Sequence, residues 1–129
     1  MLVRVVVHKI DKVTEAFESR IRSLDEYMEE LEKYMIASNE NSMARFYNFS
    51  YCRRKEDQLE PLRSLKTSEI IPELENMTSG GLYNLRSEQL DSILDALTIK
   101  DVPDNDNLKR RRIRLACGIV FQDVRELLG

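Results

Sequence analysis

The densest group of side chains that could bind a ligand is cationic and lies near the end of the sequence. Lysine and arginine at the start of a helix can contact phosphate groups, and such contacts supply most of the non-specific affinity of proteins for nucleic acid. Five cations occur within six positions here: Lys109, Arg110, Arg111, Arg112 and Arg114. This cluster supports the second of two functional predictions, a nucleic-acid-binding accessory protein of a replication or transcription assembly.

The same basic run also has an interpretation within the protein itself. The segment from 15 to 32 holds seven acidic residues against two arginines, and cations near a helix start oppose the helix dipole, so acidic partners are expected. At about 100° per residue, Arg110 and Arg114 share a helical face while Arg112 points nearly opposite. We expect Arg112 or Arg114 to serve the fold. Internal pairing is favoured, and phosphate contact stays open.

Patterns for catalysis and metal binding are missing from the sequence. His8 is the only imidazole, and no nucleophile motif surrounds Cys52, Cys117 or any serine. The acidic loop at 101–106 lacks the glycine and closing glutamate of a calcium loop. The segment 79–81 lacks the lysine and the spacing of a phosphate-binding loop. We therefore predict no catalytic residue, no metal and no cofactor, and a protein that is not an enzyme.

The longest regular pattern is an apolar stripe near the N-terminus. Apolar residues recur every three or four positions from Val3 to Met35, which places them on one face of a helix whose opposite face is charged. Such a helix needs another surface to cover its stripe. The interface residues that we expect are Phe17, Ile21, Leu24, Met28, Leu31 and Met35.

This stripe gives the main functional prediction. We expect a non-enzymatic helical interaction subunit or adaptor, with coiled-coil character, that self-associates or docks on a protein partner through the N-terminal helix. The expected assembly is a homodimer or a larger complex, without membrane association. Nucleic acid remains the alternative partner.

Further helices are expected along the chain. Residues 2–7 are β-branched and fit a short strand, yet they also continue the stripe, so helix is preferred. The polar residues at 38–42 predict the end of the first helix. A second helix is expected over 42–59, with Pro61 ending it.

The second half of the sequence has a clear break followed by two more helices. A short helix is expected over 67–76, and the glycines at 78–81 predict a hinge or subdomain boundary. Helices are then expected over 85–98 and 107–128. The unit from 85 to 117 loosely resembles small helix–loop–helix modules that bind nucleic acid.

Composition is that of one folded, helix-rich domain. The 129 residues are 42% apolar and 33% charged, with only 4 Gly and 3 Pro. We predict an all-α fold, a small helical bundle over 1–129 with long first and last helices. The net charge of −3 argues against a uniformly basic surface. No apolar run reaches about 18 residues, and two isolated cysteines fit reduced thiols, so the expected location is the cytoplasm, or the nucleus in a eukaryote.

Overall fold

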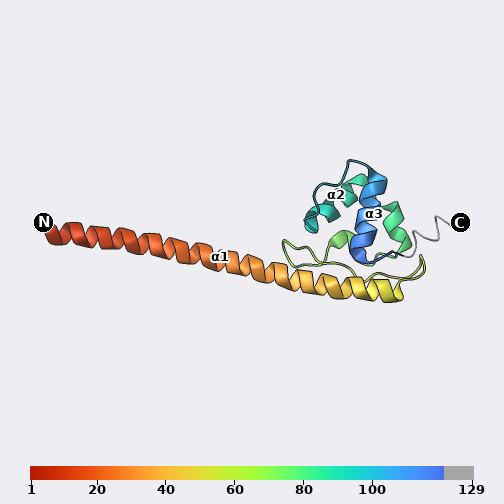
Figure 1. The fold of residues 1–129 in the computed structure, drawn as a ribbon, viewed down its shortest axis with the longest axis horizontal. Helices are drawn as coiled ribbons and strands as arrows, with labels where there is room; N and C mark the ends of the chain where they lie inside the picture. Colours follow the sequence, from red (N-terminus) through yellow and green to blue (C-terminus); the bar gives the residue numbers. More distant parts are fainter. Residues whose placement is uncertain (121–129) are drawn as a thin grey trace. The chain divides into compact units, whose positions relative to one another are not determined.

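The structure is a computed structural model that describes residues 1–120 (Figure 1). Its three α-helices are α1 (Leu2–Tyr51), α2 (Ser87–Ala96) and α3 (Asp106–Cys117), and two short 3-10 helices are η1 (Pro72–Leu74) and η2 (Gly80–Asn84). Strand-like pairing within the described range is limited to isolated bridges. The predicted all-α class is confirmed. The strand alternative for 2–7 is wrong, because these residues form the first turns of α1.

The chain divides into two compact units, and α1 contributes to both. Unit 1 is Met1–Glu32 and consists of helix; unit 2 is Lys33–Gly129, described to residue 120. The boundary expected near 78–81 lies inside unit 2. Ser79 is buried there, and the Gly80 N–H donates to the Lys55 carbonyl at 2.9 Å. Whether the chain opens at these glycines stays a prediction.

The polar residues at 38–42 do not end the first helix. They lie inside α1, so the break there and the separate helix over 42–59 are both wrong. Asn41 uses its amide outside the helix: Nδ2 donates to the Arg63 carbonyl at 2.8 Å, and Oδ1 accepts from the Arg63 N–H at 2.6 Å. An amide occupied by a tertiary partner does not compete for the backbone of its own helix.

Asn48 holds the same extended segment two turns further along. Its Nδ2 donates to the carbonyls of Glu60 (3.0 Å) and Cys117 (2.9 Å), and its Oδ1 accepts from the Glu60 N–H at 2.8 Å. The buried residues of α1 are spaced by four, three and four positions: Ala37, Asn41, Ala44 and Asn48. Two small side chains and two amides let the backbone near 60–63 approach α1 closely and pair its polar groups.

The chain between α1 and α2 is mostly irregular. Asp57 organises the end of α1, because its Oδ2 accepts from both N–H groups at 53–54, each at 2.9 Å. These backbone donors lower the pKa of Asp57. The helix expected over 67–76 is wrong except for η1, since Ser68 and Asn76 adopt positive φ values of 62° and 57°.

α2 and α3 pack against each other, and η2 packs against α3 (Figure 1). α2 lies within the expected range 85–98. α3 begins close to the expected residue, where the Asn105 Oδ1 accepts from the N–H groups of Asn107 and Leu108. The core of unit 2 contains nine large aliphatic residues that are at most 2% exposed: Leu62, Ile71, Leu74, Leu82, Leu85, Leu90, Ile93, Ile113 and Ile119.

The last helix is shorter than expected because of Gly118. This glycine has a φ of 87° and ends α3 with N–H bonds back to the carbonyls of Arg114 and Leu115. A Cβ at this position would meet the Arg45 carbonyl oxygen at 2.5 Å. The expectation of helix at 119–120 is wrong, and the remainder to 128 lies outside the described residues.

Candidate functional site

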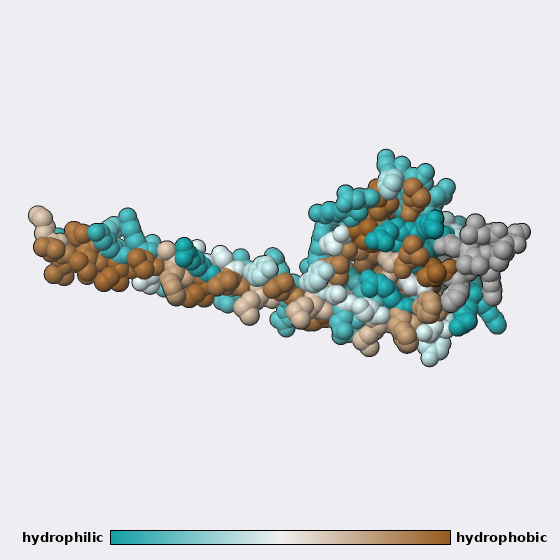
Figure 2. All heavy atoms as spheres, in the orientation of Figure 1, coloured by the Kyte–Doolittle hydropathy of each residue, from teal (hydrophilic) through white to brown (hydrophobic). Residues whose placement is uncertain are grey.

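The apolar stripe is exposed along unit 1. Figure 2 shows hydrophobic side chains running along this part of α1. Phe17 is 65% exposed, Leu24 59% and Met28 65%. Ile21 and Leu31 are also exposed, as is Met35 in the part of α1 that belongs to unit 2. All six residues expected at the interface therefore lie on the surface of one continuous helix.

The stripe widens toward the N-terminus. Its members there are Val3, Val6, Ile10 and Val13, and three further exposed apolar residues lie beside them: Leu2, Val5 and Val7. Fully burying one such side chain contributes about 1.5–3 kcal/mol. Unit 1 has no second segment that could supply this burial. Most of the stability of a helix in a protein comes from packing of its amphipathic face, so the stripe is the part of unit 1 with the most to gain from contact with another helix.

Lys109, the first cation of the basic run, has its ion-pair partners inside unit 2. It is buried, and its Nζ pairs with Asp91 Oδ1 at 2.8 Å and with Asp104 Oδ1 at 3.0 Å. These two hydrogen bonds raise the pKa of Lys109 well above its ordinary value. The acidic partners come from α2 and from the loop before α3, whereas the sequence suggested the acids of 15–32.

Two arginines of the run also make internal contacts. Arg110 Nε and Nη2 both donate to the Leu85 carbonyl, at 3.1 and 3.0 Å, and Nη1 donates to Asn107 Oδ1 at 3.1 Å. Arg114 is buried, and its guanidinium carbon lies 4.3 Å from the centre of the Tyr83 ring. We expected either Arg112 or Arg114 to serve the fold, and of these two Arg114 is the buried one.

Arg111 and Arg112 are the members of the run that face solvent. They line a shallow groove of about 510 Å³ between α3 and the loop that precedes it. The other lining residues are Lys100, Asp101, Val102, Pro103, Leu108 and Leu115. The structure therefore separates the five cations into three with contacts inside unit 2 and two with exposed side chains.

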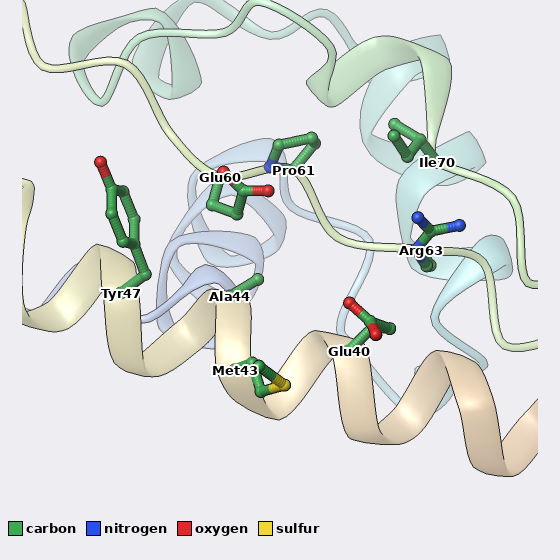
Figure 3. Close-up of a pocket in the computed structure, with 8 residues that line it drawn as sticks. All are labelled: Glu40, Met43, Ala44, Tyr47, Glu60, Pro61, Arg63 and Ile70. Carbon is green, nitrogen blue, oxygen red and sulfur yellow. The ribbon is translucent and has the colours of Figure 1, made fainter.

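A second groove lies between α1 and the segment after it (Figure 3). It measures about 280 Å³ and is lined from α1 by Glu40, Met43, Ala44 and Tyr47, and from the facing chain by Glu60, Pro61, Arg63 and Ile70. This lining contains no serine, threonine, cysteine, lysine or histidine. The groove therefore offers apolar contact and charged side chains.

The two thiols are buried in unit 2 and unpaired. Cys52 Sγ lies 3.4 Å from the Gln58 carbonyl, and desolvation raises its pKa. Burial raises the pKa of Cys117 to about 12. Since the thiolate is the reactive form, both side chains behave as small apolar core residues.

Residues 1–120 contain no group of three or more His, Cys, Asp or Glu side chains placed to hold a metal ion. None of the helices in this range combines the length and apolarity needed to cross a bilayer.

The sequence missed the two asparagines that hold unit 2 together. Asn41 and Asn48 are fully buried and bond to backbone groups 12 to 69 positions away. Their separation of seven positions, with Ala37 and Ala44 in the same row, was visible as a signal. Asn41 also belongs to the polar group at 38–42, which predicts a helix end because serine and asparagine favour such positions.

The chain matches no protein-family model, no curated protein and no solved structure. The stripe, the basic run and the two grooves are the features of the described residues that bear on function.

Proposed function

We propose that the protein is a non-enzymatic interaction subunit that associates through helix–helix packing of the unit 1 stripe. The observation that supports this most strongly is the exposure of every stripe residue from 3 to 31 on a helix with no other segment in its unit. Contiguous apolar surface of this kind marks a protein-interaction site. From 14 to 31 the stripe is as narrow as a coiled-coil seam, which suits one helix better than a globular core.

Sedimentation of the full chain tests this function. The parent chain is expected to associate at tens of micromolar. Replacing Ile21 and Leu24 by Glu places charges inside the contact, which costs several kcal/mol in principle, so the variant should sediment as a monomer. Circular dichroism confirms that unit 2 remains folded. The matched control replaces Ser19 and Ser23, outside the stripe, by Glu. A monomeric parent chain, or an Ile21→Glu/Leu24→Glu variant that assembles like the parent, would contradict the proposal.

Nucleic-acid binding receives less support. Lys109, Arg110 and Arg114 have partners inside unit 2, which leaves Arg111 and Arg112 for phosphate. Each phosphate contact adds roughly one unit to the slope of binding against salt. If this function existed, changing both exposed arginines to Gln would lower that slope by about two units. Absence of binding to DNA and RNA at low salt removes this alternative.

A further inference from the structure

The stripe of unit 1 has a regular register that defines its partner more closely. Gaps of three and four alternate from Val3 to Phe17 and again from Ile21 to Leu31. These are positions a and d of heptads labelled a to g. The two runs are joined by the four-residue step from Phe17 to Ile21, which follows another step of four. Such an insertion locally unwinds a coiled coil, and two helices that pair in register bring their insertions to the same level.

The two edges of this seam carry opposite charges. In the second run of heptads, Arg20 occupies position g on one edge, and Asp25 and Glu32 occupy position e on the other. The residues three and four positions from Arg20 on its own helix carry no negative charge: Ala16, Phe17, Ser23 and Leu24. Ion pairs among residues 1–120 occur in unit 2 and not in unit 1. Arg20 therefore has no acidic partner on its own helix.

A parallel second copy supplies that partner. In a parallel, in-register pair of helices, the residue at g faces the residue five positions later, at e, on the other helix. Arg20 then faces Asp25 of the second copy, and two-fold symmetry repeats the pair. The other pairs across the edges are compatible, because none joins like charges: Leu2 with Val7, Lys9 with Thr14, and Tyr27 with Glu32.

The antiparallel arrangement is disfavoured by the same residues. Antiparallel packing matches a to d, so Phe17 would lie opposite Leu24 and the symmetry axis would pass between positions 20 and 21. The two Arg20 side chains would then flank the axis and repel each other. Neither copy would offer a carboxylate to them at this point of the seam.

We propose that unit 1 pairs with a second copy of this chain as a parallel, in-register coiled coil, with Arg20 of each copy bound to Asp25 of the other. This inference rests on the proposed function and adds the partner, the orientation and the register. It makes the homodimer self-complementary, since the basic edge of one seam meets the acidic edge of its identical neighbour.

A cysteine at the start of the seam tests the orientation in the full chain. Val3→Cys brings two thiols together at position a in the parallel pair, and mild oxidation should crosslink most of the protein. In the antiparallel pair the same thiols would be roughly 50 Å apart. Cys52 and Cys117 are buried, so the parent chain is the control and should not crosslink.

Charge exchange tests the register. Arg20→Asp places an acid opposite Asp25 of the other copy on both edges of the seam. It should raise the Kd of the dimer about ten-fold, since it removes two exposed pairs and adds repulsion. Arg20→Asp/Asp25→Arg should restore the parent Kd within about two-fold. Arg20→Asp/Glu26→Arg has the same total charge with the new cation on the outer face, and it should not restore binding.

The outcomes distinguish failure of the parallel dimer from failure of the proposed function on which it rests. A mass of two chains, crosslinking by Val3→Cys and rescue by the charge exchange support the parallel pair. Association without crosslinking, a mass above two chains, or equal rescue by both double variants overturns the parallel dimer and leaves association through the stripe standing. A monomeric parent chain overturns both.

Discussion

Two parts of α1 use the same helical spacing for opposite purposes. In unit 1 the residues at intervals of three and four are large, apolar and exposed; in unit 2 they are two alanines and two asparagines, and they are buried. The second part is held by close backbone approach and hydrogen bonds to the extended chain near 60–63. The first has no such contact within its unit. Periodicity therefore reveals a surface to be covered, while residue size and chemistry indicate what covers it.

The largest effect that would test this contrast is expected at Asn48. Asn48→Ala leaves buried polar groups of Glu60 and Cys117 without their partner, which should lower the free energy of unfolding by about 3–5 kcal/mol. Urea denaturation measures the loss. Exposed Asn39 also lies in α1, so Asn39→Ala gains the same helix propensity without the cost. Equal stability of the two variants would remove the role assigned to the buried amide.

Gly118 is expected to give the next largest effect. Gly118→Ala forces an L-residue into a φ of 87° and places a Cβ against the Arg45 carbonyl. A loss of about 2–3 kcal/mol in unfolding free energy is expected. Gly81→Ala is the comparison, because the nearest atom there is the flexible Met77 sulfur, and it should cost less. Reversal of this order in thermal denaturation would contradict the contact between α1 and the end of α3.

A smaller effect with a defined pH dependence is expected at Lys109. Its ion pairs raise its pKa above the ordinary value of 10.5, so their contribution to stability is complete below that pH. It is lost as pH rises through the higher pKa of the folded state. Lys109→Met should lower the midpoint of urea denaturation at pH 7, and the difference from the parent should shrink above about pH 11. Exposed Arg111→Met should have little effect, and a larger loss there would reverse the assignment of the two cations.

Thiol labelling should show the smallest change. Cys52 and Cys117 are buried and their pKa values are raised, so both should resist alkylation at pH 8 until the protein unfolds. Mass spectrometry of the native protein after labelling measures this. Fast reaction of Cys117 in the folded protein would show that the core around α3 opens far more readily than its burial implies.

The sequence predicted helices best where apolar periodicity was strong. The stripe predicted α1 as far as Met35, and the leucine pattern predicted α2, because in both cases one face is apolar. Ser38, Asn39 and Asn41 produced the false break, since an amide that caps a helix and an amide that reaches across to Arg63 look the same in sequence. The end of α3 was missed because the apolar pattern continues past Gly118, while the positive φ of this glycine and its close approach to the Arg45 carbonyl are features of the fold.

The candidate site could be predicted from the sequence only in part, for a similar reason. The exposed stripe needed no tertiary information. Tertiary information was needed to separate the structural cations of the basic run from the exposed ones. The residues that contact the run come from other elements: Asp91, Asp104, Leu85 and Tyr83. Sequence geometry separated Arg112 from Arg114 by face, and the fold decided which face was buried.

Amide hydrogen exchange along α1 at several protein concentrations tests most directly whether the two parts of the helix are stabilised differently. Pairing with another molecule depends on concentration, while packing inside unit 2 does not. Protection over residues 3–31 should rise steeply with concentration, and protection over 37–48 should stay constant. Protection of both stretches that is equal and independent of concentration would contradict the account, because unit 1 would then owe its helix to contacts within its own chain.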